Sequence, residues 1–168
     1  MKRYFIPALA LAVLMLGRVP AGVSQMQIYN DADSRELQAF RLTDDLVERY
    51  RSATMAFVDW GKAHPEAKDP DDKDDEKKKA SDITISDMAA HMSSKPQFQA
   101  ILISKGITAR QYFETMLVLV TAMAAVDMER EGQKVGTVQG VSPANLDYVK
   151  RNHDHLTVIL KQMAGTDQ

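Results

Sequence analysis

The side chain best suited to chemistry is His153, which interrupts an apolar stripe near the C-terminus. A histidine in such a stripe can ligate a metal or haem iron, or can exchange protons near neutral pH. More often it is a buried imidazole that hydrogen-bonds a tyrosine, a carboxylate or a carbonyl. His155 cannot chelate a metal together with His153, because side chains two residues apart on a helix point in nearly opposite directions. The rest of the stripe, at helical spacing, is Leu146, Val149, Leu156, Leu160 and Met163.

A second set of candidate ligands is Met88, His91 and Met92, which lie within one turn of a predicted helix. Thioethers and imidazoles are ligands that suit copper(I). The chain contains ten methionines, and methionine also fills irregular gaps in apolar cores. The set therefore has two interpretations, a metal site and ordinary core packing.

A methionine together with His153 could instead ligate a b-type haem inside a helical bundle. In its export signal and its ligand types the chain resembles the cytochrome b562 group, whose axial ligands are Met and His. In that group the methionine lies early in the first helix, whereas Met55 lies past the middle of the first long helix predicted here. Haem is thus an alternative, and the favoured interpretation has no cofactor.

Common catalytic motifs are absent from the sequence. It contains no H-E-x-x-H, G-x-S-x-G or S-x-x-K pattern. Gly132, Gly136 and Gly140 form a glycine-rich segment, but it lacks both the Gly-Lys-Ser/Thr ending of a P-loop and the G-x-G-x-x-G of a dinucleotide loop. Ser142 is expected to cap a helix that starts at Pro143. We therefore expect a protein that is not an enzyme.

Composition excludes several further classes. The chain of 168 residues has a net charge of −2 and no cysteine. Disulfides, thiolate zinc sites, covalently attached haem and a cysteine nucleophile are therefore excluded. Nucleic acid is not an expected partner, because binding it requires a clustered excess of Lys and Arg.

The N-terminus has the pattern of a cleaved signal peptide. Lys2 and Arg3 precede an apolar stretch at residues 4–17, and Gly22 and Ser24 offer small residues for cleavage before Gln25. The apolar stretch, at about 14 residues, is too short to span a bilayer. We expect a signal peptide at residues 1–24, no integral membrane anchor after processing, and a periplasmic or secreted location.

Residues 108–128 are predicted to form the central helix of the fold. The run from 116 to 126 is apolar except for Thr121, and apolar residues occupy two faces. Such a helix must be covered by neighbours on more than one side. The predicted fold class is all-α, a small bundle of four to five helices around this one.

The remaining chain is divided by composition. Residues 25–42 are a polar N-terminal segment, in which Asp33 or Ser34 could cap a short helix, and residues 43–164 form a single helical domain. Residues 65–82 are predicted to be a disordered charged linker, because they contain many acids and lysines and no large apolar side chain. Its acids fit no register of a calcium-binding EF-hand loop.

Helix starts in the domain are expected at capping residues. Thr43 precedes two acids, Ser86 precedes a short apolar stripe, and Thr108 and Gln111 have the spacing of a capping box.

Residues 107–111, Ile-Thr-Ala-Arg-Gln, resemble the L-T-x-x-Q signature of exported helical stress chaperones. Residues 42–46 resemble the first half of that signature but lack its glutamine. The resemblance implies a chaperone as one alternative function. The favoured expectation is an exported, non-enzymatic helical protein that binds a protein or a small apolar ligand.

Overall fold

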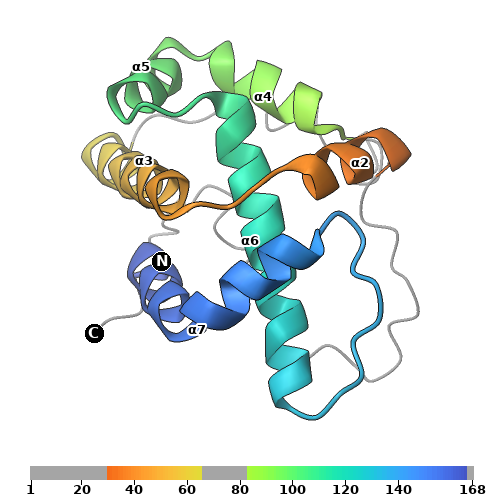
Figure 1. Ribbon diagram of the computed structural model, residues 1–168. Helices are drawn as coiled ribbons and strands as arrows, with labels where there is room; N and C mark the ends of the chain where they lie inside the picture. The colour runs from red at the N-terminus through yellow and green to blue at the C-terminus, as the bar shows by residue number, and fades with distance from the viewer. Residues whose placement is uncertain (1–29, 66–82, 166–168) are drawn as a thin grey trace.

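The computed structural model describes residues 30–65 and 83–165 (Figure 1). All regular elements in these ranges are α-helices, which confirms the all-α class. The predicted signal peptide, residues 1–24, and all of the predicted linker beyond Pro65 lie outside the described residues. The described helices are α2 (Asp31–Ala39), α3 (Asp44–Ala63), α4 (Ile85–Ser93), α5 (Pro96–Ser104), α6 (Ala109–Arg130) and α7 (Pro143–Ala164).

Helix α6 runs through the middle of the molecule, and α2, α3, α4 and α7 all contact it (Figure 1). Of its 22 residues 11 are buried, and they occupy more than one face. Val118, Leu119 and Ala122 are completely inaccessible to solvent. The predicted central helix is therefore covered by protein. No helix in residues 30–65 and 83–165 combines the length and the hydropathy needed to cross a membrane.

Three predicted helix starts are confirmed. The Thr43 side chain accepts a hydrogen bond from the backbone of Leu46, and Ser142 caps α7. Thr108 and Gln111 form the capping box of α6, in which each side chain bonds the backbone of the other. These starts were predictable because a cap involves only residues three apart.

Two predicted helix starts are wrong. Helix α4 is capped by Thr84 and not by Ser86, because Thr84 has an acid three residues later, Asp87, with which it forms a capping box. Helix α2 is capped by Asn30, whose side-chain oxygen accepts from two backbone amides of the first turn. Asp33, one of the residues predicted to cap it, instead accepts a hydrogen bond from the backbone of Ile85, at the start of α4.

Helix α2 belongs to the same core as the other helices. Leu37 is completely buried within the core cluster, and α2 contacts α6. Part of the segment predicted as polar, residues 31–39, therefore packs in the same core as the helices that follow it. With α2 included, the described residues contain six helices, one more than the upper bound of the prediction.

A polar cluster attaches α2 to α6 and α4. Arg110 of α6 donates both Nε and an Nη nitrogen to the carboxylate of Glu36 on α2, and a further Nη to Ser86 on α4, 3.2 Å away. Glu114, one turn along α6, lies 3.7 Å from Arg110. Glu114 is only 8% exposed, in the region where α2 contacts α6.

Asn145, on α7, holds the segment that connects α2 to α3. It is 1% exposed. Its amide oxygen accepts from the backbone of Leu42 at 3.0 Å, and its amide nitrogen donates to the carbonyl of Phe40 at 2.9 Å. One side chain thus satisfies two backbone groups that no helix pairs.

Replacing Asn145 with alanine should lower the free energy of unfolding by about 1–3 kcal/mol, because the buried Leu42 N–H loses its partner. The Phe40 carbonyl loses one of its two donors and keeps the other, Arg41. The measurement is urea denaturation of the purified protein. Asn152→Ala is the control, since the Asn152 amide donates only within its own helix, to the Tyr148 carbonyl. Equal effects of the two substitutions would contradict this role for Asn145.

Glu114 should make stability depend on pH. Burial, and the hydrogen bond and charge of Glu36, raise the pKa of Glu114 from 4.5 to about 7. The folded state thus holds a proton that the unfolded state releases, so the stability that Glu114 contributes is complete below pH 4.5 and is lost as the pH rises through 7. Glu114→Gln removes this loss. The free energy of unfolding of the variant minus that of the wild type should therefore rise by about 1–3 kcal/mol from pH 5 to pH 8.

Denaturation curves at pH 5 and pH 8 measure this difference. The pKa of Glu36 is lowered, mainly by the hydrogen bond from Arg110. The pH dependence of stability that Glu36 causes therefore lies below this pH range. Glu131→Gln, at the exposed end of α6, serves as the control and should show no such gain. A constant difference between Glu114→Gln and the wild type would refute the assignment.

Candidate functional site

His153 faces the core between α6 and α7. It is 8% exposed. Its Nε2 lies 2.6 Å from a carboxylate oxygen of Asp127 on α6, and its Nδ1 lies 3.3 Å from Asp154. Arg130 also bonds Asp154, at 3.1 Å. The pKa of Asp154 lies below its ordinary value because of the hydrogen bonds from His153 and Arg130.

This arrangement corresponds to the structural interpretation of His153, an imidazole that hydrogen-bonds carboxylates. A haem iron or a metal at Nε2 would have to displace Asp127. His155 lies on the opposite, exposed side of α7, as the helical geometry predicted. The geometry favours the structural role over that of a ligand.

The candidate copper ligands lie on α4. Met88 and Met92 pack against the core, whereas His91 is exposed. The structure thus divides this set between the core and the surface. Within residues 30–65 and 83–165, no group of three or more His, Asp or Glu side chains could hold a metal ion.

The chaperone-like residues 107–111 start α6. Thr108 and Gln111 are the capping box already described, and Arg110 contacts α2. Each polar side chain of this segment therefore has a structural partner. The chaperone alternative stays a prediction, which suppression of client aggregation would test.

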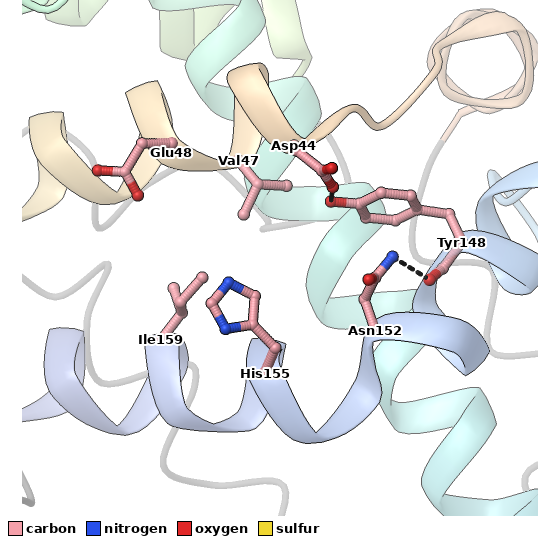
Figure 2. A pocket seen from close by; sticks show the side chains of 7 residues that line it. All are labelled: Asp44, Val47, Glu48, Tyr148, Asn152, His155 and Ile159. Atoms are coloured by element: carbon pink, nitrogen blue, oxygen red, sulfur yellow. Dashed lines mark hydrogen bonds between the residues drawn. The ribbon is translucent and has the colours of Figure 1, made fainter.

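A groove of about 300 Å³ lies between α3 and α7 (Figure 2). Val47 of α3 and Ile159 of α7 point toward one another across it and form its apolar part. Both side chains are nearly buried, so they form the floor. The exposed ring of His155 stands beside Ile159.

The other end of the groove is polar. Asp44 is the first residue of α3, and the Tyr148 hydroxyl on α7 donates to its carboxylate at 2.8 Å. Asn152 lies one turn after Tyr148 and donates its amide to the Tyr148 carbonyl at 3.0 Å (Figure 2). Glu48, one turn after Asp44, completes the lining. Small-molecule sites combine apolar surface with a few polar groups. This groove has both, at the small end of their volume range and with a larger share of polar lining residues.

The tyrosine in this groove is a fixed donor. Partial burial, followed by the hydrogen bond and charge of Asp44, raises the pKa of Tyr148 above its ordinary value. Tyr148 therefore keeps its proton at neutral pH and holds one oxygen of Asp44 in place.

A second groove, of about 350 Å³, lies between α2 and the segment before α7. All its lining residues are polar, and it lacks an apolar floor. Ser34 is buried there, and its hydroxyl has no hydrogen-bond partner in the part of the chain that the structure describes. The lining residues are Asp31, Ser34, Arg35, Gln38 and Gln139.

None of the groove residues between α3 and α7 was a candidate in the sequence. Asp44 was expected only to stabilise the start of a helix, and His155 only to lie away from His153. The groove forms where two helices about 100 residues apart in the chain meet, as the Asp44–Tyr148 contact shows. No local pattern encodes such a meeting.

The chain was also compared with known proteins. No protein-family model, no curated protein and no solved structure matches it. The site must therefore be interpreted from its own geometry.

The geometry of His153 yields a test of the haem alternative. Because Nε2 is bound to Asp127, micromolar haem added to the purified protein should produce no saturable change in the haem absorption spectrum. A stoichiometric complex that His153→Ala abolishes would instead establish His153 as an iron ligand. Thermal unfolding of the variant controls for loss of structure.

Proposed function

We propose that this chain is an exported, non-enzymatic helical protein that binds a small ligand in the groove between α3 and α7. The observation that carries the proposal is the combination, in one cavity, of an apolar floor with polar acceptors. Val47 and Ile159 supply the floor, and Asp44 and Asn152 supply the acceptors. Burial of a ligand's hydrocarbon part would provide affinity, and the polar end would orient it.

The other polar groups near the core support this choice of site. His153 and Asn145 are each satisfied by partners within the protein. A satisfied buried group has little to offer a ligand, since a new partner would have to break an existing hydrogen bond. The groove differs because its acceptors face solvent.

Export is the part of the proposal that rests on the sequence alone. The basic residues Lys2 and Arg3, the apolar residues 4–17 and the small residues Gly22 and Ser24 together support a cleaved signal peptide. The absence of cysteine means that stability in an oxidising compartment would come from the core alone.

Partly filling the groove should weaken binding. We expect His155→Trp to weaken the binding of short-chain alkyl probes by about tenfold or more, since an indole would occupy part of the cavity. The measurement is titration of the purified protein with 1-hexanol, hexylammonium and hexanoate, followed by NMR shifts of Val47 and Ile159.

Arg151→Trp is the matched control, because Arg151 is exposed on the same helix and does not line the groove. It should leave the affinity unchanged. Binding of none of the three probes to the wild type, or equal loss in both variants, would overturn the proposed site.

A further inference from the structure

The polar end of the groove contains two oxygen acceptors that have no hydrogen-bond partner among the described residues. The Tyr148 hydroxyl donates to Asp44, and one of the two N–H groups of the Asn152 amide donates to the Tyr148 carbonyl. At the apolar end, the His155 ring adds a nitrogen donor and acceptor. The second carboxylate oxygen of Asp44 and the amide oxygen of Asn152 remain. A ligand with N–H donors would match these two oxygens.

The charge at this end also lacks a counterpart. In the first turns of α3, Asp45 pairs with Arg49 at 2.9 Å and Glu48 pairs with Arg51 at 2.6 Å. Asp44 takes part in no ion pair among the described residues, and its hydrogen-bond partner is a neutral phenol. The start of α3 compensates part of its charge through the helix dipole. Asp44 is thus the carboxylate of this helix start that a ligand cation would complement.

The apolar floor continues directly from the polar end. Val47 lies one turn from Asp44 on α3, and Ile159 faces Val47 from α7 (Figure 2). The shape and the charge together call for a ligand with a cationic head and a short hydrocarbon body. An ammonium group carries three N–H donors and one positive charge, which match the free acceptors and the unpaired carboxylate.

We propose that the groove binds a small primary amine as its ammonium ion, with the head at Asp44 and Asn152 and the hydrocarbon part on Val47 and Ile159. This ligand class rests on the proposed function, because it assumes that the groove is a small-molecule site. The floor explains why a bare metal cation or ammonia is not the expected ligand. Neither could use the contact with Val47 and Ile159.

The experiment compares three probes with the same chain and different heads, namely hexylammonium, 1-hexanol and hexanoate. Each is titrated into the purified full chain by calorimetry. Hexylammonium should bind about fivefold more tightly than 1-hexanol, since one solvent-exposed ion pair adds roughly this factor. Hexanoate should bind most weakly, because its charge repels Asp44.

Substitutions at α3 assign the charge to one residue. Asp44→Asn keeps an oxygen for the Tyr148 hydroxyl but removes the charge, so it should reduce hexylammonium binding by about fivefold and leave 1-hexanol binding unchanged. Asp45→Asn is the matched control, because Asp45 is adjacent and paired with Arg49 but does not line the groove. Asn152→Ala provides a second test at an uncharged position and should weaken hexylammonium binding by about threefold.

The outcomes separate this inference from the function on which it rests. Equal affinity for hexylammonium and 1-hexanol would overturn the amine class and retain the groove as a small-molecule site. Equal losses in Asp44→Asn and Asp45→Asn would show general attraction to an acidic surface and would also overturn the amine class. Failure of all three probes to bind would overturn the proposed function itself.

Discussion

The structure depends on the need to cover α6 on more than one side. A helix with apolar residues on two faces cannot be stable in water unless neighbours remove most of its surface, and half of its residues are in fact buried. Helices α4 and α7 make its most extensive contacts, and α2 and α3 cover the remainder. Helices α3 and α7 both pack on α6 and also contact one another, and the groove lies where they meet.

Hydrophobic burial does not by itself determine how the covering helices are placed, because it has no direction. Polar contacts supply that information here. Asn145 fixes the connection between α2 and α3 against α7, while Arg110 holds α2 against α6 and reaches α4. Each contact joins segments far apart in the chain, and those of Asn145 also satisfy buried groups that would be costly to leave unpaired. These side chains therefore specify the arrangement that the apolar residues stabilise.

This division explains what the sequence could predict. The all-α class, the helix predicted at residues 108–128 and the caps at Thr43 and Thr108 depend on periodicity or on residues three apart, and they are confirmed. The packing of α2 and the burial of Glu114 depend on contacts between distant segments, which leave no local pattern. The groove is the clearest example. In the sequence Asp44 is an ordinary acid in the first turn of a helix, and only the folded structure places Tyr148 beside it. Export and function are not tested by the fold and stay proposals.

Whether a polar side chain near the core is structural or functional can be judged from whether the protein itself satisfies it. His153 was the strongest candidate in the sequence. In the structure, however, both of its ring nitrogens lie beside carboxylates of the same chain, so neither nitrogen is available to a ligand. Asp44 was not a candidate in the sequence. In the structure it accepts a hydrogen bond from the Tyr148 hydroxyl and has no cationic partner in the described chain. Surface carboxylates without partners are common, and a single one does not indicate a binding site. What distinguishes Asp44 is its position, because it ends an apolar cavity where a ligand could bury hydrocarbon and complete an ion pair together.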